Sequence, residues 1–143
     1  MTGLIVGTLD ILSAFIIVLS RGSTVTRLLQ FIASGLLGPQ AFQGGVATAI
    51  LGLALHFFIA FTLVAVFYVA RGRFGFVRDH AISSGIIYGL IVYVVMNLVI
   101  LPLSAAKPRH SISGDLIQIG IHMFVIGLPT SLLLQRLSGG RAS

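Results

Sequence analysis

Apolar residues dominate four long stretches of this 143-residue chain, and shorter polar segments separate them. The clearest stretch runs from Gly45 to Ala70 and contains no Asp, Glu, Lys or Arg. A helix needs about 20 apolar residues to cross the hydrocarbon core of a bilayer, so this stretch predicts a transmembrane helix. The same pattern predicts spans at about 3–20, 81–103 and 115–137. We therefore expect an all-α integral membrane protein with four transmembrane helices, forming a single domain over residues 1–143.

The first apolar stretch could instead be a signal peptide. However, no basic residue precedes its apolar part, Asp10 interrupts it, and no small-residue cleavage site stands before Arg21. We therefore expect this stretch to be retained as the first transmembrane helix.

The segment between the first two spans is amphipathic. Ser23 could cap a helix covering about residues 24–37, which would carry its polar residues on one side. Glycines and Pro39 interrupt the segment, so it does not predict a span. Two interpretations stay open. An interfacial helix on the bilayer surface is favoured by hydropathy, and a re-entrant helix would need protein or water around its irregular backbone.

Small residues recur at helical spacing in the predicted spans. Gly3 and Gly7 are four residues apart, as are Gly85 and Gly89, and this spacing lets membrane helices approach closely. In the second span His56 lies on a face of small residues, so we expect it to point towards a neighbouring helix. The members of that face are Gly45, Ala49, Gly52, His56 and Ala60. The similar placement of His56 and His122 suggests two hairpins related by a parallel repeat, a match that length and composition alone could also produce.

Two prolines fall in the second half of the chain. Pro102 should close the third helix, and Pro129 should bend the fourth helix because it leaves the carbonyl of Val125 without its usual donor.

Composition and charge support the membrane class. Hydrophobic residues make up 57% of the chain and charged residues only 8%, which leaves too little polar surface for a water-soluble globule. The net charge of +6 would suit nucleic acid, but the basic residues lie at the ends of the apolar stretches. We therefore expect the lipid bilayer as partner and no nucleic acid. The absence of cysteine excludes disulfides and thiolate metal sites.

The distribution of basic residues predicts an orientation. With four spans both termini lie on one side, and that side carries five Lys and Arg residues against four on the other. Its densest group, Arg71, Arg73 and Arg78, lies in the shortest loop. The positive-inside rule then places both termini in the cytoplasm.

Each predicted span carries one strongly polar side chain. At a rise of 1.5 Å per residue, these four side chains fall within about one helical turn of a common level. An ionisable group inside a bilayer is disfavoured by roughly 2.5–3.5 kcal/mol and usually faces a partner in the bundle. We therefore predict an intramembrane polar layer of Asp10, His56, Asn97 and His122, supported by Ser13, Tyr93 and Gln118.

Several interpretations of this layer stay open. The four side chains could only hydrogen-bond one another and hold the bundle together. They could bind or conduct a proton or a small polar solute, because Asp and His can exchange protons. His56 and His122 could ligate one haem iron, or Asp10, His56 and His122 could hold a divalent metal.

A further interpretation assigns no chemistry to the layer. The chain could be a non-catalytic subunit or assembly factor of a larger membrane complex, or a homo-oligomer, with glycine-rich faces that bind the partner. The sequence contains no Ser-His-Asp spacing, phosphate loop or paired-carboxylate motif, so we expect no catalytic residues, and the sequence favours a protein that is not an enzyme without deciding it.

Three strings carry a resemblance to a known group: LLQFIASGLLGPQAFQGGVATAILGLALHFFIAF at 28–61, YGLIVYVVMNLVILPLSA at 88–105 and HMFVIGLP at 122–129. The chain resembles small bacterial inner-membrane proteins of unassigned function. This resemblance implies a protein with four transmembrane helices in the bacterial inner membrane. It implies no activity, substrate or site residue.

Overall fold

The computed structural model describes residues 1–106 and 112–139, and its regular structure is helical. Within these residues four helices are long and apolar enough to cross a membrane, and there is no strand. The helices are Thr2–Ser20, Gly45–Arg73, Ala81–Leu103 and Ile112–Leu137. The expected all-α architecture with four candidate spans is therefore confirmed.

Two of the spans are interrupted by short segments of wider helix. The third span consists of α5, a π-helical segment η2 and α6, and the fourth consists of α7, a second π-helical segment η3 and α8. In chain order the described elements are α1 (Thr2–Ser20), α2 (Val25–Leu37), the 3-10 helix η1 (Gly38–Gln43), α3 (Gly45–Arg73), α4 (Gly75–Asp79), α5 (Ala81–Val95), η2 (Met96–Ile100), α6 (Leu101–Leu103), α7 (Ile112–Ile121), η3 (His122–Gly127) and α8 (Leu128–Gly139).

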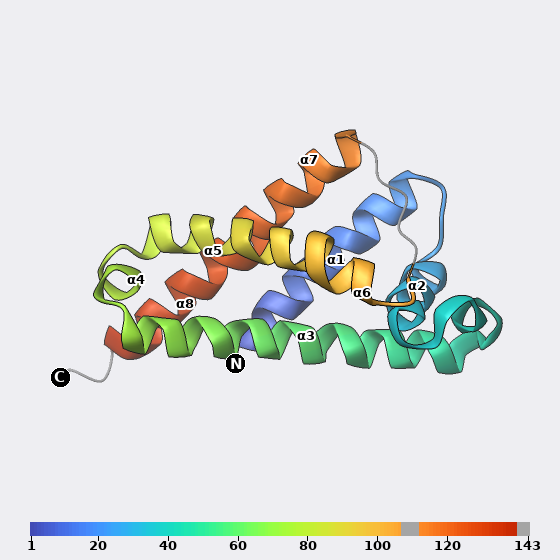
Figure 1. The fold of residues 1–143 in the computed structure, drawn as a ribbon, viewed down its shortest axis with the longest axis horizontal. Helices are drawn as coiled ribbons and strands as arrows, with labels where there is room; N and C mark the ends of the chain where they lie inside the picture. Colours follow the sequence, from blue (N-terminus) through green and yellow to red (C-terminus); the bar gives the residue numbers. More distant parts are fainter. Residues whose placement is uncertain (107–111, 140–143) are drawn as a thin grey trace.

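The four spans run along the long axis of the molecule and alternate in direction (Figure 1). The connection that contains α2 lies at one end, together with α6 and the start of α7. We call this the α2 end. The opposite end holds α4, the end of α3 and the start of α5, and we call it the α4 end. α3 and the fourth span run in the same direction, from the α2 end towards the α4 end.

Large apolar side chains are exposed on the outer faces of the bundle. Ile16, Phe58 and Leu98 are 70%, 69% and 70% exposed, although each lies within a long helix. A water-soluble bundle would bury such side chains, whereas hydrocarbon solvates them without cost. The pattern of exposure fits a bundle that uses lipid as its solvent.

The two Gly-x-x-x-Gly pairs mark close helix contacts, as the sequence predicted. A Cβ atom on Gly7 would lie 3.0 Å from the ring of Phe57, so α1 packs directly on α3. A Cβ atom on Gly89 would overlap the carbonyl oxygen of His122, so α5 meets the fourth span backbone to backbone. In both hairpins, therefore, the first helix packs on the second through its glycines.

The helix α2 packs against protein at the α2 end. Its N-cap is Thr24, whose hydroxyl accepts from the Arg27 N–H at 3.2 Å, and not Ser23 as the sequence suggested. Ser23 is displaced from that role because its own N–H closes the end of α1 by donating to Val18. A Cβ atom on Gly52 of α3 would overlap the carbonyl oxygen of Leu29, which shows how closely the two helices approach.

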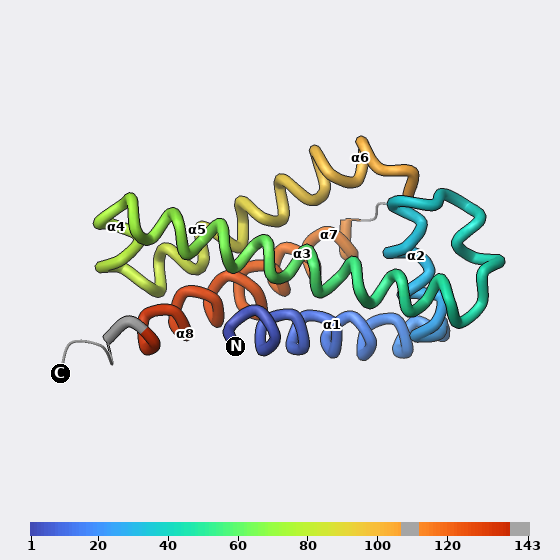
Figure 2. The backbone as a smooth tube through the Cα atoms, turned by 90° about the horizontal axis from the view of Figure 1, so that it is seen from below, coloured from blue at the N-terminus to red at the C-terminus, as the bar shows by residue number. Residues whose placement is uncertain are grey.

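Polar bonds connect the same segment to its neighbours. Gln30 Nε2 donates to the Gly45 carbonyl at 3.1 Å, and the Ala105 N–H donates to the Gly35 carbonyl at 3.1 Å. Figure 2 shows α2 between the ends of α1 and α6. α2 therefore forms one wall of the bundle at this end.

Each π-helical segment precedes a proline. Proline lacks an N–H and its ring clashes with the carbonyl four residues earlier, so the wider i to i+5 pattern relieves a conflict that an α-helix could not. η2 precedes Pro102 and contains Asn97, and η3 precedes Pro129 and begins at His122. Two residues of the predicted polar layer thus lie where the helices depart from α geometry, a departure frequent at functional sites.

Candidate functional site

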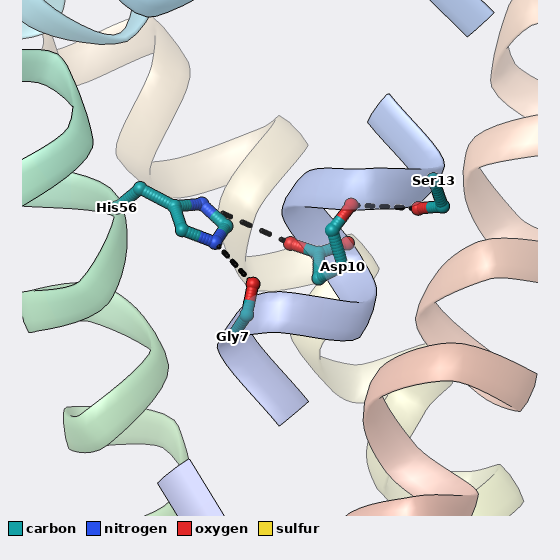
Figure 3. A network of polar contacts seen from close by, with 4 residues as sticks. All are labelled: Gly7, Asp10, Ser13 and His56. Atoms are coloured by element: carbon teal, nitrogen blue, oxygen red, sulfur yellow. Dashed lines mark hydrogen bonds and ion pairs between the residues drawn. The ribbon is translucent and has the colours of Figure 1, made fainter. Parts of the chain in front are cut away.

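Asp10 of α1 and His56 of α3 face each other inside the bundle (Figure 3). The distance from Asp10 Oδ2 to His56 Nδ1 is 4.0 Å, and the two side chains are 25% and 11% exposed. The other ring nitrogen, His56 Nε2, lies 2.8 Å from the carbonyl oxygen of Gly7. The close approach of Gly7 to α3 brings this carbonyl within reach of the histidine.

The bond to Gly7 determines which nitrogen of His56 carries hydrogen. A carbonyl oxygen only accepts hydrogen bonds, so Nε2 must be the donor and Nδ1 is the nitrogen that faces Asp10. One further proton can then be held by one or the other member of the pair. It resides on Nδ1 and gives an ion pair, or it resides on the Asp10 carboxyl and gives a neutral pair. Loss of that proton leaves a net charge of −1 between α1 and α3.

All four residues of the predicted layer line one cavity of about 450 Å³. This volume lies within the range of about 300–1,000 Å³ that small-molecule sites occupy. The cavity reaches from Arg21, Ser104 and Asp115, near the α2 end, to Asp10 and His56. Leu28, Phe31, Ile32 and Gly35 of α2 contribute one of its walls.

Asn97 and His122 bond to their own helices and not to the other polar side chains. Asn97 Nδ2 donates to the Tyr93 carbonyl at 3.0 Å, and His122 Nδ1 donates to the Gln118 carbonyl at 2.8 Å. The ring of Tyr93 meets the His122 ring edge-on at 5.7 Å between centroids. Hydrogen bonding among the four side chains therefore does not describe this layer, in which only Asp10 and His56 face each other directly.

The supporting residues have different positions. The Ser13 hydroxyl donates to the backbone carbonyl of Asp10 at 2.7 Å and therefore braces α1 without touching the carboxylate (Figure 3). Gln118 lines the cavity and holds His122 through its backbone carbonyl. Tyr93 contacts the site through its ring on His122.

Acidic residues are concentrated at this cavity. Two of the three acidic residues of a chain that carries nine Lys and Arg, Asp10 and Asp115, line it. Arg21 is the only Arg among the described lining residues. Asp115 was not predicted as a site residue from the sequence. The feature that could have indicated it is the spacing of Asp115, Gln118 and His122, which places the three residues on one face of the fourth span.

A smaller cavity of about 120 Å³ adjoins the first at Asp10, His56 and His122. Its remaining lining is apolar and includes Val6, Leu63 and Ile126. Val6 is 1% exposed and Ile126 is 4% exposed, so packed side chains end the cavity here. The polar side chains of the two cavities thus meet at the Asp10–His56 pair, and the lining beyond the pair is apolar.

The suggested cofactors fit this geometry poorly. Within the described residues no three His, Asp or Glu side chains form a group that could hold a metal ion. His122 has the arrangement of a ligand, because Nδ1 is bonded to a carbonyl and leaves Nε2 for iron. His56 lacks this arrangement, because its Nε2 already donates to Gly7. A haem held by both histidines would have to break that bond.

Comparison with models of protein families, with curated proteins and with solved structures found no match to this chain. The fold and the site define a helical protein with four candidate membrane spans and an internal polar cavity.

Proposed function

We propose that this protein binds a small cation in the polar cavity, in exchange for a proton that Asp10 or His56 holds. The observation that carries the proposal is the Asp–His pair at the inner end of a cavity of about 450 Å³. When this proton leaves, the pair has a charge of −1, and a cation in the cavity replaces the lost positive charge. The low dielectric between the helices strengthens this attraction.

The exchange depends on the other charged and titratable groups around the pair. His122 of η3 and Asp115 of α7 line the same cavity, as does Arg21 at the end of α1. The walls from α2 and η2 contribute no titratable side chain among the described residues. Since protons compete with the cation, cation affinity should rise with pH, by up to tenfold per pH unit for one proton released.

Tetramethylammonium is a suitable probe of this exchange. Added to the purified protein in weak buffer with a pH-sensitive dye, it should release about one proton for each cation bound. Asp10→Asn should abolish the release. Asp79→Asn is the matched control, because Asp79 is exposed and pairs with Arg78 away from the cavity. Binding without proton release, or equal release from Asp10→Asn, would contradict the proposal.

Access to the cavity from the aqueous phase is expected at the α2 end. The natural chain contains no cysteine, so a single introduced thiol reports one position. Ala14→Cys lies in the cavity lining and should react with a membrane-impermeant methanethiosulfonate added on the α2 side, more slowly when tetramethylammonium is present. Leu12→Cys is the control, because Leu12 is 49% exposed on the outer face of α1 and lies outside the cavity lining. Reaction of Ala14→Cys from the α4 side only would reverse the proposed direction of entry.

We also propose the bacterial inner membrane as the location, with both termini in the cytoplasm. The resemblance of the strings at 28–61, 88–105 and 122–129 supports the location. The concentration of Arg71, Arg73 and Arg78 at the α4 end supports the orientation. The cavity would then open to the side opposite the cytoplasm. Both Gly-x-x-x-Gly pairs and Gly52 are occupied by contacts within the chain, so these glycines add no support for a partner subunit.

A further inference from the structure

An apolar groove of about 330 Å³ lies between α3 and the third span. Its rim includes Phe58, Val66 and Ile91, which are 69%, 53% and 51% exposed on the outer face of the bundle. Two hydroxyl groups lie in its lining, and both are satisfied by backbone. Thr62 donates to the Phe58 carbonyl at 2.8 Å, and Tyr88 donates to the Leu63 carbonyl at 2.6 Å. The groove therefore presents a hydrocarbon surface to its occupant.

The groove adjoins the polar cavity. Ile59 and Met96 line the groove, the polar cavity and the smaller cavity that joins the polar cavity at Asp10. Methionine is unbranched and flexible, and a change of its rotamer alters the space around it at little cost. Met96 is also the first residue of the π-helical segment η2. Ile59 and the flexible side chain of Met96 thus lie between the groove and the cavity that holds the Asp10–His56 pair.

We infer that the cation exchanged at Asp10 and His56 is amphiphilic, with an ammonium head in the polar cavity and a hydrocarbon tail in the groove between α3 and α5. This inference rests on the proposed function and names its substrate class. A groove that faces lipid gains little from hydrocarbon alone, because lipid tails are as apolar as the groove. The charge of the head therefore supplies the affinity, and the tail holds the head beside Met96. Such a ligand would enter sideways from the bilayer.

A pair of photoreactive probes tests this assignment in liposomes that contain the full chain. One probe is decyltrimethylammonium with a diazirine at the end of its chain, and the other is decanol with the same diazirine. Mass spectrometry of peptides should find the ammonium probe on groove residues in excess of the alcohol probe. Excess unlabelled decyltrimethylammonium should remove that labelling. Asp10→Asn should reduce it to the level of the alcohol.

A second experiment fills the groove with a larger side chain. Val95 lines the groove and is 40% exposed, so Val95→Trp should occupy the space of the tail and lose the excess labelling. Val94→Trp is the matched control, because Val94 is 41% exposed on the same helix but lies outside the groove lining. Circular dichroism of both variants establishes that they fold.

The outcomes separate this inference from the proposed function. Equal labelling by the ammonium and alcohol probes, or labelling that survives Asp10→Asn, means that the groove holds bulk lipid only and overturns the inference. If tetramethylammonium still releases protons from the wild-type chain in an Asp10-dependent way, the proposed function survives that result. Loss of this release in the wild-type chain overturns both.

Discussion

Gly127→Ala is expected to lower the melting temperature of the purified protein by roughly 5–10 °C, which corresponds to about 2–3 kcal/mol for forcing extra volume into a packed contact. A Cβ atom at this position would overlap the carbonyl oxygen of Gly85 and the backbone of Gly89. Backbone atoms within a helix cannot move aside as the end of a flexible side chain can. The third and fourth spans would have to separate along their crossing.

Gly120→Ala is the matched control for this effect. Gly120 lies on α7 of the same span, and among the described residues no atom beyond its adjacent residues and its own helix backbone lies within 4 Å of the position where its Cβ would be built. Replacing glycine by alanine inside a helix favours folding by about 0.5–1 kcal/mol when no contact opposes it. Gly120→Ala should therefore match or exceed the wild-type melting temperature in circular dichroism. Equal stability of the two variants would show that the crossing at Gly127 is looser than the structure indicates.

The contact between Gly127 and the pair Gly85 and Gly89 illustrates which packing contacts a sequence predicts. The pair Gly85 and Gly89 was recognisable because its spacing is known to support close helix contact, and the contact is present. Gly127 was not recognisable as their partner. It lies in a π-helical segment before Pro129, and no second glycine stands three or four residues away from it. The contact depends on the geometry of two spans together.

The candidate site was also predictable from the sequence only in part. Hydropathy and helical rise placed Asp10, His56, Asn97 and His122 at one level, and one cavity accommodates all four. They did not tell which side chains face each other, because depth carries no information on which helices are neighbours. The Gly7 carbonyl that selects the His56 tautomer also went unrecognised, since any backbone carbonyl is invisible in a sequence pattern. The sequence left open whether α2 lies on the bilayer surface or packs on protein, because an amphipathic hydropathy pattern fits both.

Asp10→Asn is expected to weaken binding of tetramethylammonium by about 100-fold, because removing one partner of a buried charge interaction costs about 2–5 kcal/mol. The amide keeps the shape of the carboxyl group but carries no exchangeable charge. The free energy of unfolding should change by less than about 1 kcal/mol, since polar contacts between membrane helices average about 0.6 kcal/mol. A large loss of binding beside a small loss of stability distinguishes a ligand site from a contact that only holds helices together.

His56→Gln completes the test, because glutamine can still donate to the Gly7 carbonyl but cannot share a proton with Asp10. It should also weaken binding. The double variant should bind no more weakly than Asp10→Asn alone. When two residues act as one unit, removing the second adds no further loss. Isothermal titration of the wild type, both single variants and the double variant measures this coupling, and chemical unfolding measures stability in parallel. Additive losses of binding would mean that Asp10 and His56 act separately. If stability falls as much as binding, the loss of binding follows from a weakened bundle. The pair would then be only a contact that holds α1 and α3 together.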